Sequence, residues 1–320
     1  MTRAALVLAA LLIAAPSAVA RVSGGTPVAL VTAETENQLI AVEFPQGEVL
    51  RRVTVAADPQ NVVADQRTAV VVSPGSGAVT LLYARTLRVR KVLGGLGAPH
   101  LAALTPDGKW AFVTDDPRGQ LDVVSLTRLR IVKRLYVGSG AHHLSLSPDG
   151  QRLWIALGEH ARELSIVDVS RPEHPRLLRR FDPGFVAHDL AFSPNGSRVW
   201  VTSAQDSSVR VLSSTTGRRL FSVSAGPPPQ HVVFGAWTRP RAYVTSGYAS
   251  RITMVDPRRG RILRIASAPY GSFNVTLIGG NVVTSSLLRG TVTDFDSDLR
   301  LRRTVRIAPA ARGVAGVVWP

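Results

Sequence analysis

A short turn motif recurs along the chain at nearly constant spacing, and this repetition limits the folds that the chain can adopt. The motif reads Thr105-Pro106-Asp107-Gly108, Ser147-Pro148-Asp149-Gly150 and Ser193-Pro194-Asn195-Gly196. A proline in the second position followed by Asp-Gly or Asn-Gly favours a tight turn. Short apolar segments stand on both sides of each copy, for example residues 101–104 and 111–114. Each copy therefore predicts two antiparallel strands joined by a hairpin.

Weaker copies extend the repeat through the rest of the chain. When each repeat is anchored on the first residue of its leading strand, the anchors are Asn61, His100, His143, Asp189, His231, Asn274 and Gly313, which lie 39 to 46 residues apart. One repeat contains four strand-like segments, at residues 143–146, 153–157, 164–169 and 176–181. Seven repeats of four short strands predict an all-β fold, a seven-bladed β-propeller with four antiparallel strands in each blade.

The two ends of the repeat region predict how the ring closes. The first strand, residues 29–32, corresponds to the second strand of a repeat, and no leading strand precedes it. The last strand, residues 314–318, corresponds to a leading strand. We therefore expect the C-terminal strand to join the N-terminal blade, which hides two strand edges.

The second strands of several repeats carry a further motif. It reads Phe112-Val113-Thr114-Asp115, Trp200-Val201-Thr202-Ser203 and Tyr243-Val244-Thr245-Ser246. Together with the turn motifs and the pairs Val167-Asp168 and Val255-Asp256, it makes residues 27–320 resemble the YVTN-repeat (WD40-like) β-propellers. The repeats at residues 72–75 and 284–286 depart from the pattern because they lack the aromatic residue. The resemblance implies a propeller fold and an exported binding protein, but no single activity, because propellers serve many functions.

The first 20 residues have the pattern of a signal peptide. Arg3 supplies a positive charge, residues 4–15 are apolar, and Ala18-Val19-Ala20 is similar to a cleavage site. We expect residues 1–20 to be removed and residues 21–320 to form one propeller that is secreted, in a periplasm or at a cell surface. The apolar run is shorter than the roughly 20 residues of a transmembrane helix, although an uncleaved anchor is the alternative. The chain has no cysteine, which excludes disulfides, zinc–thiolate sites and thiolate catalysis.

The chain is strongly basic, with 38 Lys and Arg residues against 22 Asp and Glu residues and a net charge of +16. Arginines concentrate in the fourth strand of each repeat, as at residues 51–52, 88–90 and 179–180. This strand should be the outer edge of a blade, where charge prevents edge-to-edge association. The alternative is electrostatic contact with anionic polymers or lipid headgroups. Most aromatic residues lie in second strands and should be packed, so the pattern does not support sequence-specific binding of nucleic acid.

Histidines gather where leading strands begin. His100, His142, His143, His188 and His231 stand there in four repeats, and Asp189 follows His188. We expect these six residues to surround the mouth of the central channel and to bind a ligand. Imidazoles and carboxylates also bind divalent metals such as zinc or copper. A metal site is therefore predicted from His100, His143, His188, His231, Glu159 and His160, the last two from a hairpin on the same face. The alternative is that these side chains bond backbone and water around a wet channel.

The sequence leaves three function classes open. The first is a non-catalytic binding or scaffold propeller with its ligand, a small molecule or a peptide, at the channel mouth, since no catalytic triad or nucleophile motif is recognisable. The second is an enzyme, either a lactonase-like, metal-dependent hydrolase or a quinoprotein- or haem-type oxidoreductase. The third is an envelope scaffold whose arginine-rich rim contacts a component of the cell envelope.

Overall fold

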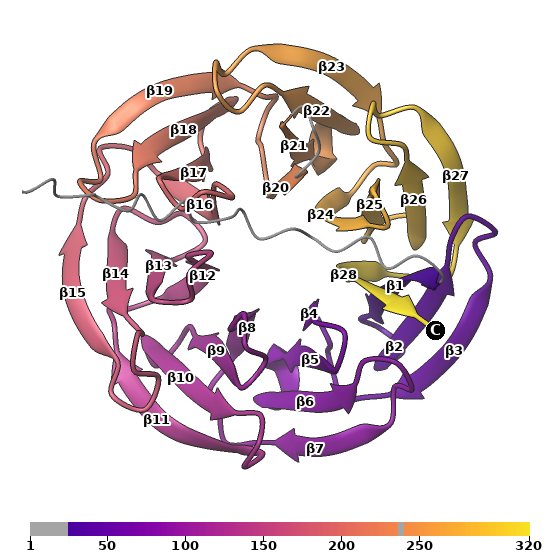
Figure 1. The fold of residues 1–320 in the computed structure, drawn as a ribbon, viewed down its shortest axis with the longest axis horizontal. Coiled ribbons are helices and arrows are strands. Elements are labelled where there is room, and N and C mark those ends of the chain that lie inside the picture. Colours follow the sequence, from indigo (N-terminus) through magenta and orange to yellow (C-terminus); the bar gives the residue numbers. More distant parts are fainter. Residues whose placement is uncertain (1–24, 236–239) are drawn as a thin grey trace, which may run out of the picture.

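The computed structural model of the protein describes residues 25–235 and 240–320. These residues form seven sheets of four antiparallel strands, which stand around a central axis as the blades of a propeller (Figure 1). The predicted fold class is thus confirmed. The predicted signal peptide, residues 1–20, lies outside the described residues. None of the helices described is long and apolar enough to cross a membrane.

The blades follow one another along the chain, and each contains strands named here A to D from the axis outward. Blade 1 has β28 (Ala311–Trp319), β1 (Thr26–Ala33), β2 (Gln38–Glu43) and β3 (Val49–Thr54). Blade 2 has β4 (Asn61–Ala64), β5 (Thr68–Ser73), β6 (Ala78–Tyr83) and β7 (Val89–Leu93). Blade 3 has β8 (Pro99–Leu104), β9 (Trp110–Asp115), β10 (Gln120–Ser125) and β11 (Arg130–Tyr136). Blade 4 has β12 (Ala141–Leu146), β13 (Arg152–Leu157), β14 (Leu164–Asp168) and β15 (Arg176–Phe181).

The remaining blades have the same order. Blade 5 has β16 (Ala187–Phe192), β17 (Arg198–Ser203), β18 (Ser208–Ser213) and β19 (Arg219–Ser224). Blade 6 has β20 (Val232–Gly235), β21 (Arg241–Ser246), β22 (Arg251–Val255) and β23 (Ile262–Ser267). Blade 7 has β24 (Ser272–Ile278), β25 (Asn281–Ser286), β26 (Thr291–Phe295) and β27 (Leu301–Arg306). Short 3-10 turns follow β5 (η1, Pro74–Ser76) and β21 (η2, Gly247–Ala249).

The C-terminal strand closes the ring, as the sequence predicts. Strand β28 pairs antiparallel with β1, for example Val317 with Val28 and Ala315 with Leu30. The first blade is therefore built from both ends of the described chain, and β28 and β1 lie side by side in Figure 1. This pairing satisfies the backbone groups of two strands that would otherwise be free edges.

The repeated turn motif folds through its own side chains. In the first copy the Gly108 amide donates to the Thr105 carbonyl at 2.9 Å, and the Lys109 amide donates to Asp107 Oδ1 at 3.1 Å. Gly108 has a φ of 67°, a left-handed conformation that favours glycine. The same bonds recur in the second copy, which explains why the motif marks every A–B hairpin in the middle of the chain.

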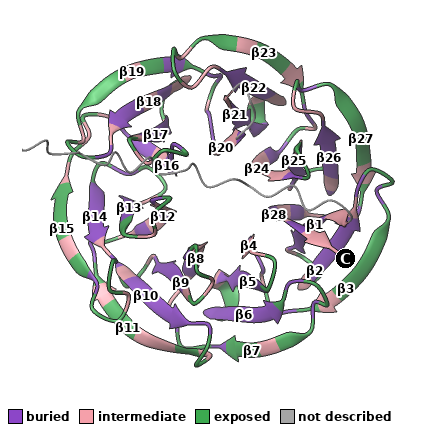
Figure 2. Cartoon of the chain, viewed as in Figure 1, coloured by how far each residue is buried: buried purple, intermediate pink, exposed green. Residues whose placement is uncertain are grey.

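The core lies between the blades. B and C strands are buried almost throughout, whereas D strands are exposed (Figure 2). Large aromatic side chains of the B strands pack against the next blade. The Trp200 ring of blade 5 meets the Phe234 ring of blade 6 edge to face at 5.5 Å, and Trp154 meets Phe192 in the same way at 6.3 Å. These contacts hold neighbouring blades at a constant angle, and so position the A strands around the axis.

Candidate functional site

A break in strand pairing directs residues at the start of five A strands toward one end of the channel. The pairing of A with B shifts register at the start of β8, β12, β16, β24 and β28. In β8, for example, Pro99 pairs with Asp115 and Ala102 with Val113, so His100 and Leu101 together oppose Thr114. This is a β-bulge, which redirects side chains and leaves an N–H without a ladder partner.

A threonine of the B strand accepts a hydrogen bond from that free N–H. The amide of Leu101 donates to Thr114 Oγ1 at 3.1 Å, and that of Asp189 donates to Thr202 Oγ1 at 2.9 Å. His231 and Gly313 make the same bond to the threonines of their own blades. The threonine of the repeated B-strand motif therefore has a defined structural role.

These bonds correct one predicted repeat anchor. Leu101, not His100, is the blade 3 residue that corresponds to Asp189 and His231, because its amide makes the threonine bond. His100 instead corresponds to His142, the first residue of the bulge in blade 4. Sequence spacing missed this shift because a bulge adds a residue without changing the hydrophobic pattern around it.

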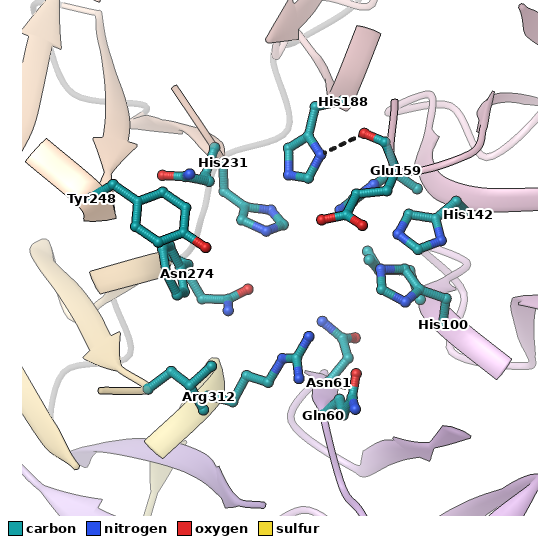
Figure 3. A pocket seen from close by; sticks show the side chains of 15 residues that line it. Gln60, Asn61, His100, His142, Glu159, His188, His231, Tyr248, Asn274 and Arg312 are labelled. Carbon is teal, nitrogen blue, oxygen red and sulfur yellow. Dashed lines mark hydrogen bonds between the residues drawn. The ribbon is translucent and has the colours of Figure 1, made fainter. Parts of the chain in front are cut away.

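The bulge residues line a cavity of about 360 Å³ at the channel mouth. Its size is within the range of small-molecule sites. All seven blades contribute to its wall (Figure 3): Gln60, Asn61, His100, Leu101, His142, His143, Glu159, His188, Gln230, His231, Tyr248, Phe273, Asn274, Leu287 and Arg312.

Five imidazole rings form one cluster on the side of blades 3 to 6. His143 is at its centre, with ring centroids 4.3 Å from His188, 4.7 Å from His142 and 5.0 Å from His100. His231 completes the cluster at 5.6 Å from His143. The His143 side chain is buried, and its Nδ1 has no hydrogen-bond partner among the described residues.

Three of the rings are oriented by an oxygen atom that contacts their Nδ1. His142 Nδ1 contacts the carboxylate of Asp116, and His188 Nδ1 donates to the Glu159 carbonyl oxygen at 3.1 Å. His231 Nδ1 lies 3.2 Å from Asp189 Oδ2. An oxygen partner at Nδ1 keeps the proton there and leaves the lone pair on Nε2, which is the arrangement of metal-binding histidines.

Burial favours the neutral form of four rings of the cluster. It lowers the pKa values of His100 and His143 well below the usual value, and the neighbouring histidines act in the same direction. The pKa of His142 is lowered by burial, although Asp116 opposes the shift. The pKa of His188 is lowered by burial and by His231. Neutral imidazole is the form that binds a metal, so no proton has to leave these rings first.

The arrangement can hold a metal ion on three imidazoles. One ligand atom from each of His100, His142 and His143 lies within 4.8 Å of the others, a grouping found among the residues that the structure describes. Zinc–nitrogen bonds of about 2.0–2.1 Å require a closer approach of these three ligand atoms. Three protein ligands leave a coordination position free toward the cavity.

The opposite wall carries hydrogen-bonding groups. Figure 3 shows the Arg312 guanidinium reaching into the cavity beside the amide of Asn61, across from His188. Arg312 Nη1 is paired with Glu34 Oε2 at 2.9 Å, which holds the guanidinium in place. Asn61 Oδ1 is buried without a hydrogen-bond partner among the described residues. The cavity thus has a histidine-rich side and a polar side.

The structure brings together most of the residues singled out from the sequence. His100, His142, His143, His188 and His231 line the cavity, as does Glu159, while Asp189 lies behind His231. His160 is exposed and does not line the cavity. The three-histidine group includes His142, which the predicted metal set omits, and leaves out His188, His231, Glu159 and His160.

Sequence reasoning did not assign the polar wall or the role of Asp116. Asn61 and Asn274 stood at repeat anchors, so their place in the repeat was an available indication. Arg312 directly precedes the anchor Gly313. Asp116 follows a B strand, and only its contact with His142 distinguishes it from other acidic loop residues.

Comparison with known proteins shows the fold. No protein-family model matches the chain, and no curated protein does. Among solved structures, it is similar to a functionally unknown protein from Desulfotomaculum acetoxidans DSM 771, with a TM-score of 0.79, 14% identity, and 92% of this chain and 99% of that chain covered. It is also similar to hydrazine synthase of Kuenenia stuttgartiensis, with a TM-score of 0.69, 16% identity, and 83% and 91% covered.

A third similar structure is dihydro-heme d1 dehydrogenase NirN in complex with DHE. Its TM-score is 0.65 at 17% identity, with 88% of this chain and 64% of that chain covered. At such low identity the likeness extends to the fold alone, and propellers of one architecture differ in function. The chain is a seven-bladed β-propeller whose C-terminal strand completes the first blade.

Proposed function

We propose that this protein is a binding propeller that holds a divalent transition-metal ion at the channel mouth, on His100, His142 and His143. The observation that carries the proposal is that one ligand atom from each of these three rings lies within 4.8 Å of the others. Of the three, His142 has an oxygen partner at Nδ1, the Asp116 carboxylate, which leaves Nε2 as its ligand atom. Imidazole nitrogen suits zinc, copper and nickel better than calcium or magnesium.

The rest of the cavity supports a role for the metal in ligand binding. An ion on three imidazoles would face Arg312, Asn61 and Asn274 across the cavity. A small ligand with an oxygen donor could bind the ion with one end and these side chains with the other. This arrangement extends the sequence-based hypothesis of a ligand at the channel mouth.

The test compares the full chain with two paired variants. Elemental analysis and calorimetric titration with Zn²⁺ and Cu²⁺ would be performed on the wild type, on His100→Ala/His143→Ala and on the control His160→Ala/His174→Ala. Both control histidines are exposed. We expect near-stoichiometric metal in the wild type and the control, and its loss in the first variant. Absence of metal binding by the wild type, or equal loss in both variants, would rule the site out.

Hydrolysis at the metal is a second candidate function. Figure 3 shows the Glu159 carboxylate projecting into the cavity between His188 and His142, where it could serve as a general base. Turnover of lactones or phosphoesters that depends on both the metal and Glu159 would support this activity. A haem- or quinone-type activity would instead show a visible absorption band in the purified protein.

Membership of the YVTN-repeat family and export remain part of the proposal. They rest on the B-strand and turn motifs and on the pattern of residues 1–20. A mature protein outside the cytoplasm that begins at Arg21 would support export, and retention of residues 1–20 would count against cleavage.

A further inference from the structure

The outer wall of the propeller carries a second recess, and the residues that line it differ in kind from the histidine cluster. It lies where the D strand of blade 1 meets the A–B turn and the C–D turn of blade 2, and has a volume of about 990 Å³. Its wall contains five arginines and no carboxylate: Arg51, Arg52, Val53, Gln66, Arg67, Tyr83, Arg85, Thr86, Leu87, Arg88 and Val89. A concave surface with one sign of charge concentrates its field.

Four of these arginines are free to meet a ligand. Arg52 is not among them, because its Nη2 donates to the Ile307 carbonyl at 2.7 Å on the side of blade 7. Arg51, Arg67, Arg85 and Arg88 are exposed, and none has a carboxylate within 4.0 Å among the described residues. We call these four residues the arginine groove.

Other arginines of the rim are neutralised by acids. Arg134 pairs with Asp122 at 2.9 Å, Arg176 with Asp168 at 2.8 Å, and Arg128 with Glu173. Rim arginines of blade 6 are unpaired as well among the described residues, so the lack of a partner alone does not distinguish the groove. The groove differs in gathering its unpaired arginines around one recess, although their mutual repulsion disfavours the arrangement.

Neighbouring groups position two of the guanidiniums. Arg51 Nη1 donates to the Thr86 carbonyl at 3.1 Å, which leaves its other N–H groups free. The Arg88 guanidinium stands 4.7 Å from the centre of the Tyr83 ring, and Arg90 stands 5.0 Å from the same ring. The ring thus holds cations rather than offering a free face for a nucleobase.

We propose that the arginine groove binds the phosphate groups of a linear phosphate polymer, by charge and without reading a sequence. Arginine forks suit phosphate oxygens, and a groove fits a chain better than it fits a flat membrane surface. The site is independent of the metal centre, since it shares no residue with it.

The test uses inorganic long-chain polyphosphate as the probe and the full chain as the protein. The groove variant is Arg51→Gln/Arg67→Gln/Arg85→Gln/Arg88→Gln. The matched control is Arg258→Gln/Arg259→Gln/Arg261→Gln/Arg264→Gln. These four arginines of blade 6 are also exposed, without an ion pair among the described residues, and line neither cavity. Both variants remove the same charge, so a difference between them reports the groove and not the net charge.

We expect the groove variant to bind polyphosphate at least about tenfold more weakly, and the slope of log K against log salt to fall by about three, because roughly 0.7 ions are released per phosphate contact on a single strand. The control should lose about twofold or less. Equal losses in both variants would overturn the proposal in favour of general charge attraction. Binding to anionic lipid vesicles but not to polyphosphate would overturn it in favour of a membrane surface. Circular dichroism establishes that both variants are folded.

Discussion

The imidazole rings of His100 and His142 stack face to face, with their centroids 3.5 Å apart and their planes inclined by 17°. The two rings are the first bulge residues of neighbouring blades, so the stack spans a blade interface. Both rings have a lowered pKa because they are buried, which leaves them neutral at pH 7. The stack is therefore a pair of unprotonated imidazoles.

Asp116 should control the metal affinity of this pair without binding the metal itself. Its carboxylate contacts His142 Nδ1 and so keeps the lone pair on Nε2. We expect Asp116→Asn to weaken Zn²⁺ binding by about 10–100-fold, the usual effect of removing such a partner. Isothermal titration measures the change, and Asp298→Asn, at an exposed carboxylate, is the control. Unchanged affinity in Asp116→Asn would show that His142 is not a ligand.

The metal-free protein should lose stability as the pH falls below about 6.5. Burial lowers the pKa values of His100, His142, His143 and His188 in the folded state. Below the ordinary histidine pKa, these histidines bind protons in the unfolded chain but not in the folded chain. The free energy of unfolding therefore falls. Each histidine lowers the free energy of unfolding by at most about 1.4 kcal/mol per pH unit below about pH 6.5. Above about pH 6.5 its stabilising contribution is fully present.

Denaturant unfolding between pH 7.5 and 5.5 tests this with one substitution. His143→Gln should reduce the pH dependence by about the share of one histidine, while His174→Gln, at an exposed site, should leave it as in the wild type. Aspartates that titrate in the same range contribute equally to the pH dependence of stability in all three proteins. Identical pH dependence in all three would contradict the assignment of His143 as a buried neutral ring.

Asp294 should destabilise the fold at neutral pH. Its side chain is buried, and burial raises its pKa to about 6. The unfolded carboxyl ionises near pH 3.8, so its contribution to stability is greatest below that pH and falls as the pH rises through about 6. We expect Asp294→Asn to raise the free energy of unfolding by about 1–2 kcal/mol at pH 8 and to lose that advantage near pH 4.

Asn281 can keep its hydrogen bond to residue 294 in this variant. Its Nδ2 donates to Asp294 Oδ2 at 3.2 Å, and the amide oxygen of the variant can accept the same bond. Melting temperatures at pH 4 and pH 8 measure the effect. A variant that is less stable than the wild type at pH 8 would mean that the carboxylate is better compensated in the fold than its burial indicates.

Trp200 should be among the residues that hold the ring together. It is fully buried and packs edge to face on Phe234 of the next blade at 5.5 Å. We expect Trp200→Ala to cost about 3–5 kcal/mol because it leaves a cavity between two blades. Tyr136→Ala, at a ring that is 57% exposed, is the control and should have a small effect. Urea unfolding compares the two, and equal effects would place the main stabilisation elsewhere.

The sequence by itself determined the architecture of this protein. Turn chemistry is local: Asp107 and Gly108 form their hairpin through bonds within a few residues, so the motif that they belong to marks a blade wherever it occurs. The spacing of the anchors then determined the number of blades, and the leading strand at residues 314–318 determined ring closure. The gathering of histidines at the starts of A strands could be predicted for the same reason, because equivalent positions of a cyclic repeat surround one axis.

Only the tertiary structure decided which of these side chains meet. The bulge in β8 moved His100 onto the stack with His142, and the contact between Asp116 and His142 joins two blades. Arg312 faces the cluster although it lies far along the chain from all five histidines. The arginine groove likewise exists because blade 1 lies against blade 2, which places Arg51 and Arg88 in the wall of one recess that contains no carboxylate. Such contacts depend on the angle between blades, which packing in the interblade core determines and which no short segment of sequence encodes.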